Sequence, residues 1–125
     1  MSFGDEFLDN LLPPQEEEGK LRVRVLPGEE PGSASFQIDD EDHTLGNALR
    51  YMIMKNPHVE FCGYSIPHPS ESVMNIRIQI YPEYEEETRP VDALMKGLDD
   101  LRDLCDVVEE KFVAARDSFN EEQGV

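Results

Sequence analysis

Basic residues, cysteine and long apolar runs are all scarce in this 125-residue chain, and each scarcity excludes a class of function. Acidic residues outnumber basic ones 28 to 11, which gives a formal net charge of −17 at pH 7. Nucleic-acid binding draws mainly on Lys and Arg, so this charge predicts no direct contact with DNA or RNA. Any such work would go through a partner. The alternative is that the negative charge only keeps the chain soluble, and composition does not distinguish this from a role beside nucleic acid through a partner.

Membrane spans and disulfides are not expected either. No apolar stretch approaches the roughly 20 residues that a membrane helix needs. Residues 1–6 have neither a basic nor an apolar leader segment, so we expect no secretory signal. Cys62 and Cys105 each lie in an apolar pattern, which predicts buried, reduced thiols in an intracellular protein.

No residue pattern indicates catalysis, a cofactor or a metal. His58, Cys62 and His68 match no standard zinc spacing and lack an evident fourth ligand. The acidic run at residues 39–42 lacks the alternating ligands and central glycine of a calcium loop. Phosphate-binding loops, dinucleotide fingerprints and nucleophile elbows are absent from the sequence. We therefore expect a non-enzymatic protein without a cofactor.

Residues 1–19 differ in composition from the rest of the chain. A Pro-Pro pair at 13–14 and three glutamates at 16–18 predict a flexible acidic arm, followed by a folded domain at residues 20–121. Docking of the arm on a partner stays open, because apolar residues recur there at helical spacing: Phe3, Phe7, Leu8, Leu11 and Leu12.

Hydrophobic periodicity predicts an α+β domain of order ββαββα, with antiparallel strands covered by two helices on one layer. Alternating apolar residues predict strands over residues 21–26, 34–38 and 74–80, and a weaker strand over 59–66. The first helix is expected to be capped by Thr44 and to end before Pro57. Its apolar face holds Leu45, Ala48, Leu49, Met52 and Ile53.

A second, long helix is predicted from about Pro90 to Phe119, with two apolar rows at the three-then-four spacing of helix-on-helix packing. One row is Val91, Leu98, Cys105, Phe112 and Phe119, and the other is Leu94, Leu101, Val108 and Ala115. Gly97 indicates a tight contact, because glycine costs about 1 kcal/mol against alanine in a helix.

The length of this helix indicates what its rows are for. About 30 residues make a rod of about 45 Å, whereas a compact domain of about 100 residues is roughly 35 Å across. The helix should therefore outrun its own sheet and leave Phe112 and Phe119 uncovered, as protein interfaces do. The alternative is that the whole stripe packs on the sheet and first helix of the same chain.

The block from Asp42 to Arg50, DHTLGNALR, resembles the dimerisation motif of alpha-type RNA polymerase subunits. The stretch PHVEFCGYSIPHPSE at residues 57–71 strengthens the match, and the resemblance spans about residues 20–119. Residues 61–71 are more similar to the small form shared by polymerases I and III than to the RNA polymerase II form, which is the alternative. Tyr51 stands where the bacterial motif has a basic residue, so bacterial contacts with the large subunits are not carried over.

The resemblance implies a heterodimerisation domain in the nucleus, including the nucleolus. The implied partner is the larger alpha-like subunit of polymerases I and III, and the pair assembles the large catalytic subunits. A rival of another class is a small homodimeric ligand-binding domain, which sedimentation of the chain alone would reveal.

The predicted partner interface combines this motif with the long helix. Gly46 would let a partner backbone come close, and Asn47 and Arg50 would fix orientation by hydrogen bonds. Two alternatives stay open: Asn47 could cap its own helix, and Arg50 could form an ion pair within the chain. The full set is Leu45, Gly46, Asn47, Leu49, Arg50, Met52, Ile53, Leu94, Leu98, Leu101, Cys105, Val108, Phe112 and Phe119.

Overall fold

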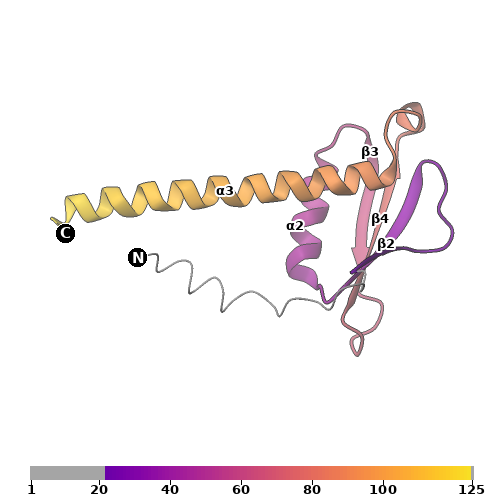
Figure 1. Ribbon diagram of the computed structural model, residues 1–125, viewed down its shortest axis with the longest axis horizontal. Helices are drawn as coiled ribbons and strands as arrows, with labels where there is room; N and C mark the ends of the chain where they lie inside the picture. Colours follow the sequence, from indigo (N-terminus) through magenta and orange to yellow (C-terminus); the bar gives the residue numbers. More distant parts are fainter. Residues whose placement is uncertain (1–21, 125) are drawn as a thin grey trace.

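The computed structural model describes residues 22–124, which form one four-stranded sheet, two α-helices and a short 3-10 helix (Figure 1). The predicted acidic arm at residues 1–19 lies outside this range. In chain order the elements are β1 (Val23–Val25), β2 (Ser33–Asp39), α2 (His43–Met54), β3 (Val59–Ser65), β4 (Val73–Ile80), η1 (Pro82–Tyr84) and α3 (Pro90–Glu122).

The sheet is antiparallel throughout, in the order β1-β2-β4-β3. β1 and β2 pair as an antiparallel hairpin, in which Val23 pairs with Ile38 and Val25 with Phe36. A register shift between Val59 and Phe61 interrupts the pairing of β3 with β4. Such a bulge changes which side chains of a strand face the core, and this explains why simple alternation indicated β3 only weakly.

One face of the sheet carries the hydrophobic core, and both helices cover it. The even-numbered side chains of β4 from Met74 to Ile80 are buried, as the alternation predicts. Leu49 and Ile53 of α2 and Ala93 and Leu94 of α3 pack over them. The predicted α+β layout, with two helices on one layer, is confirmed.

Carboxylates hold the first turns of both α-helices. The N-cap of α2 is Asp42, whose side chain accepts the Thr44 backbone N–H at 2.9 Å, so the prediction of Thr44 as the cap was wrong by two residues. Asp92 accepts the backbone N–H of Arg89 at 3.0 Å, one residue before Pro90 begins α3. These backbone hydrogen bonds hold the pKa of both carboxyl groups below the ordinary aspartate value.

α3 extends far beyond the body of the domain. The helix has 33 residues, which corresponds to about 50 Å. Its buried residues, Pro90, Ala93, Leu94 and Gly97, all lie in the first third of its length. The remainder projects away from the sheet as a free rod (Figure 1). The predicted overrun is confirmed, and the alternative, in which the whole stripe packs on the sheet and first helix of the same chain, is wrong.

Candidate partner-binding surface

The projecting part of α3 exposes large apolar side chains to solvent. Phe112 is 65% exposed and Phe119 is 59% exposed, and Leu104 and Val108 are exposed as well. Large aromatic side chains at such exposure are unusual on the surface of a soluble monomer unless a partner covers them.

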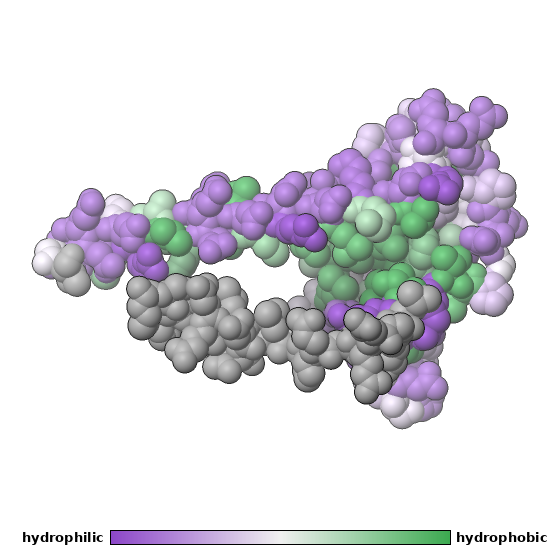
Figure 2. All heavy atoms as spheres, viewed as in Figure 1, coloured by the Kyte–Doolittle hydropathy of each residue, from purple (hydrophilic) through white to green (hydrophobic). Residues whose placement is uncertain are grey.

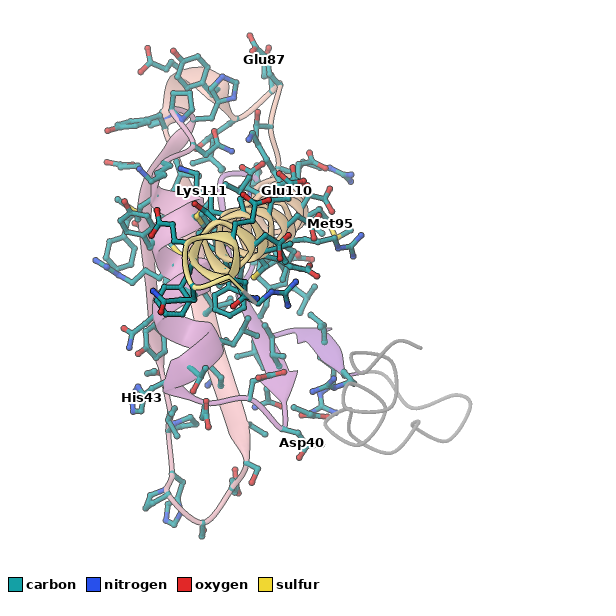
Figure 3. The ribbon with its side chains drawn as sticks, turned by 90° about the vertical axis from the view of Figure 1, so that its left-hand side faces the viewer. Asp40, His43, Glu87, Met95, Glu110 and Lys111 are labelled. Carbon is teal, nitrogen blue, oxygen red and sulfur yellow. The ribbon has the colours of Figure 1, made fainter. Side chains whose placement is uncertain are left out.

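These apolar side chains share one side of the helix. Figure 3, a view along α3, places the charged Glu110 and Lys111 on the upper side, away from His43 at the start of α2. In Figure 2 the apolar surface gathers on the body next to α3, and smaller apolar patches lie along the projecting part of the helix. Half-buried Leu45 and Leu98 pack against the core. The surface is therefore a strip that begins beside the body and continues along the projecting rod.

Gly97 fixes the crossing of α2 and α3. A Cβ atom at Gly97 would lie 2.5 Å from Cγ1 of Ile53, and 3.4 Å from a methyl carbon of Leu49. Only a glycine lets α3 approach α2 so closely, and the tight contact predicted at Gly97 is confirmed. Leu49 and Ile53 are consequently enclosed by the chain itself.

Gly46 also serves a contact within the chain. A Cβ atom there would lie 2.5 Å from a ring carbon of Tyr64 in β3, so the aromatic ring of the same chain occupies the space that the sequence suggested for a partner backbone. The Tyr64 hydroxyl lies 2.8 Å from Nδ1 of His43, which ties the same ring to the start of α2. Within the chain, Gly46 therefore makes room for the Tyr64 ring, and its role as a point of close partner approach stays a prediction.

The predicted interface residues fall into three groups in the structure. The first is buried within the chain: Gly46, Leu49, Ile53 and Leu94. The second is half-buried along the junction of α2 with α3: Leu45, Met52, Leu98 and Leu101. The third is exposed: Asn47, Arg50, Cys105, Val108, Phe112 and Phe119.

Asn47 and Arg50 lie on the outer side of α2 with their polar groups available. Among residues 22–124, neither side chain makes a hydrogen bond or an ion pair with another residue. The two intramolecular alternatives for these residues, a helix cap and an internal ion pair, are therefore not seen in the described range. Their neighbours Tyr51 and Met54 are exposed apolar residues that the sequence pattern did not predict for the interface. Met54 is not one of the five residues of the apolar face of α2, and Tyr51 stood out only as a departure from the bacterial motif.

The two cysteines differ in their surroundings. Cys62 is buried in the core, and burial raises the pKa of its thiol to about 11. Cys105 is exposed on the apolar strip, so the prediction of two buried thiols was wrong for this residue. The apolar pattern around Cys105 belongs to a surface that the rest of residues 22–124 does not cover.

Residues 22–124 contain no cluster of three or more His, Cys, Asp or Glu side chains that could hold a metal ion. Neither α2 nor α3 is both long and apolar enough to cross a membrane. The feature that distinguishes the described surface is the apolar strip of α3.

Comparison with known proteins places this chain in a dimerisation family. The family model described as "RNA polymerase Rpb3/Rpb11 dimerisation domain" matches residues 33–111. The crystal structure of DNA-directed RNA polymerase subunit L from Thermoplasma acidophilum is 21% identical, with a TM-score of 0.63 over 79% of this chain and 92% of that one. At this identity the likeness supports the fold.

Relatives named "DNA-directed RNA polymerases I and III subunit RPAC2" are closer in sequence. The protein from Saccharomyces cerevisiae is 67% identical over 99 residues, 79% of this chain and 66% of the relative. The protein from Schizosaccharomyces pombe is 63% identical over 93 residues, 73% of this chain and 71% of the relative. The protein from Danio rerio is 47% identical over 103 residues, 82% of this chain and 88% of the relative. This chain therefore belongs to the Rpb3/Rpb11 dimerisation family of RNA polymerase subunits.

Proposed function

We propose that this chain is the small alpha-like subunit shared by RNA polymerases I and III, and that it heterodimerises with their larger alpha-like subunit. The names of its relatives support the assignment to these two polymerases. The observation that carries the proposal is the apolar strip of α3, which residues 22–124 leave exposed. The role is architectural, and no step of catalysis falls to this chain.

The partner contact comprises the strip and the adjoining side of α2. Its apolar part is Leu45, Met52, Leu98, Leu101, Cys105, Val108, Phe112 and Phe119. Asn47 and Arg50 supply hydrogen bonds at its edge, which set orientation more than affinity. Gly46, Leu49, Ile53 and Leu94 contribute indirectly, because they hold α2 and α3 at the angle that shapes the surface.

The energetics favour a permanent pair. Covering one large apolar side chain contributes about 1.5–3 kcal/mol, so burial of Phe112 and Phe119 is a substantial part of an interface. Obligate interfaces commonly bury more than about 2,000 Å², and a rod of about 50 Å offers enough length for such an area. The domain proposed for this role spans residues 20–121.

Charge determines how the subunit serves transcription. With a net charge of −17, the chain repels a phosphate backbone, so its contribution to DNA and RNA handling is indirect. The joined pair provides a platform on which the large catalytic subunits assemble. This function places the chain in the nucleus, including the nucleolus, where polymerase I works.

Identification of the proteins that co-purify with the tagged full-length chain at natural abundance tests the proposal. We expect the larger alpha-like subunit and the large catalytic subunits of both polymerases. Recovery of RNA polymerase II subunits instead would contradict the assignment to polymerases I and III. Recovery of a homodimer without polymerase subunits would contradict the function altogether.

A further inference from the structure

The face of the sheet opposite both helices carries a groove of about 410 Å³. Arg77 of β4 lines this groove, and it pairs with Ser35 of β2 and with Gly63 of β3. Successive side chains of a strand point to opposite faces, and the neighbours of Arg77 in β4 are buried in the core. The groove therefore lies on the side of the sheet away from α2 and α3, which Figure 1 shows together on the other side.

Two apolar side chains, Leu26 and Phe61, border this groove. The backbone N–H of Leu26 donates to the carbonyl of Ser35 at 2.8 Å, so Leu26 continues the same face of the sheet beyond β1. Phe61 is 45% exposed, and its ring lies over Gly63, where a Cβ atom would come within 2.8 Å of a ring carbon. The groove thus offers an apolar contact on each side of Arg77.

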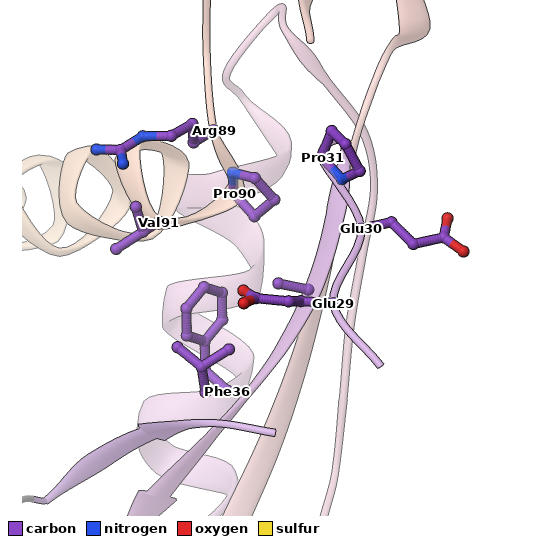
Figure 4. A pocket seen from close by; sticks show the side chains of 9 residues that line it. Glu29, Glu30, Pro31, Phe36, Arg89, Pro90 and Val91 are labelled. Carbon is purple, nitrogen blue, oxygen red and sulfur yellow. The ribbon is translucent and has the colours of Figure 1, made fainter. Parts of the chain in front are cut away.

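The charge of the groove differs from that of its surroundings. Arg77 donates to two serine hydroxyls of β2 at 3.3 Å each, and no carboxylate within residues 22–124 pairs with it. No acidic residue lines the groove. The groove beside the start of α3, by contrast, contains Glu29 and Glu30 (Figure 4), and the hollows at both ends of the sheet contain further carboxylates. An acidic ligand therefore fits the groove at Arg77 better than these.

The N-terminal segment of the chain has the matching composition. Residues 1–21 precede the first described residue and contain six acidic residues and one basic residue. Large apolar residues stand at positions 3, 7, 8, 11 and 12, interspersed with Asp5, Glu6 and Asp9. Residues 3–12 thus combine apolar anchors for the two sides of the groove with carboxylates for the arginine between them.

The groove lies within reach of this segment. The carbonyl of Arg22 accepts the backbone N–H of Asp39 at 2.8 Å, so the segment joins the sheet at the end of β2. Two strand spacings and four residues along β4 separate this point from Arg77, a span of about 16 Å. A flexible linker over residues 13–21 has a root-mean-square length of about 17 Å. The effective concentration of a tethered ligand is highest when its linker length matches the span, and it reaches the millimolar range.

We propose that residues 3–12 of the same chain occupy the groove, with apolar side chains against Leu26 and Phe61 and a carboxylate paired with Arg77. The helices cover one face of the sheet, and the N-terminal segment covers the middle of the other. This inference goes beyond the proposed function and does not depend on it, because the groove and the strip of α3 lie on opposite sides of the sheet.

Photo-crosslinking from position 61 tests this inference. A benzophenone amino acid replaces Phe61 in the full-length chain, which keeps an aromatic ring at the edge of the groove, and the crosslinked peptides are identified by mass spectrometry. We expect crosslinks to residues 3–12. Crosslinks to another protein, to another segment of this chain, or to nothing would overturn the inference.

Isotope labelling shows whether the segment belongs to the same molecule. When ¹⁵N-labelled and unlabelled chains are mixed before irradiation, each crosslinked pair should be wholly labelled or wholly unlabelled. Mixed pairs would show that a second copy supplies the segment, which contradicts the inference. The same probe at Tyr51, which is 58% exposed on α2, is the control for position and should not reach residues 3–12.

Charge reversal at Arg77 provides a second readout. Arg77→Glu should lower the crosslinking yield from position 61 roughly fivefold, because it replaces an ion pair with repulsion. Arg102→Glu is the matched control, since Arg102 is exposed on α3, and it should change the yield less than about twofold. Protection of Cys62 from alkylation verifies that both variants are folded. Equal yields from the two variants would contradict the pairing with Arg77.

Discussion

At the scale of single residues, the fit between α2 and its neighbours depends on two glycines. Gly46 admits the ring of Tyr64, and Gly97 admits the side chain of Ile53. Both contacts lie inside the chain, although Gly46 belongs to the motif by which the family resemblance was found. A residue of a dimerisation motif can thus act by shaping the subunit before it meets its partner.

We predict that Gly97→Ala lowers the free energy of unfolding by up to about 2 kcal/mol. Overpacking a tight core costs about 1–3 kcal/mol, and the roughly 1 kcal/mol that alanine gains in helix propensity offsets part of this cost. Urea denaturation of the purified heterodimer, compared with wild type at one protein concentration, measures the change. A variant more stable than wild type would show that α2 and α3 are not packed as closely as described.

The two thiols should differ strongly in reactivity. Burial raises the pKa of Cys62 to about 11, so this thiol stays protonated and enclosed at pH 8. Cys105 is exposed on the strip and should be alkylated readily in the isolated chain at a concentration too low for self-association. Mass spectrometry should find one label per native chain and two after denaturation. Rapid labelling of Cys62 in the native chain would contradict the described core.

At the scale of elements, periodicity predicted the strands and both helices. All of them except the exposed strand β1 bury one face against the same core. It did not predict the bulge in β3, which depends on pairing with β4. It could not separate Leu94, which the chain buries, from Phe112, which it exposes, because both are apolar at seam positions. Which part of the row is buried within the chain depends on how far the sheet and α2 extend along α3, and the sequence pattern does not show this.

For α3 itself, we predict that Leu101→Asp or Phe112→Asp reduces recovery of the larger alpha-like subunit on co-purification at least tenfold. Each substitution forces a charge into the proposed apolar contact. The matched control is Val107→Asp, because Val107 is 44% exposed on the same helix but lies outside both seam rows. Recovery should stay near wild type with this control. Equal recovery from all three variants would exclude the strip as the contact.

At the scale of the whole molecule, an acidic body carries one long apolar strip. The net charge favours solubility, whereas the exposed apolar strip favours binding to another protein. The chain alone should therefore self-associate through the strip as its concentration rises. Co-expression with the larger alpha-like subunit should replace these species by a single heterodimer. Sedimentation velocity distinguishes the two states, and a stable monomer at high concentration would contradict the expectation.

The most direct test of the strip as a partner contact is the alkylation rate of Cys105 within the assembled polymerase. Cys105 lies at the midpoint of the exposed row, and Cys62 of the same chain is an internal reference for intact folding. We predict that assembly slows alkylation of Cys105 at least tenfold relative to the isolated chain at a concentration too low for self-association, while Cys62 stays unlabelled in both. A Cys105 that reacts equally fast in the assembled enzyme would show that no partner covers the strip.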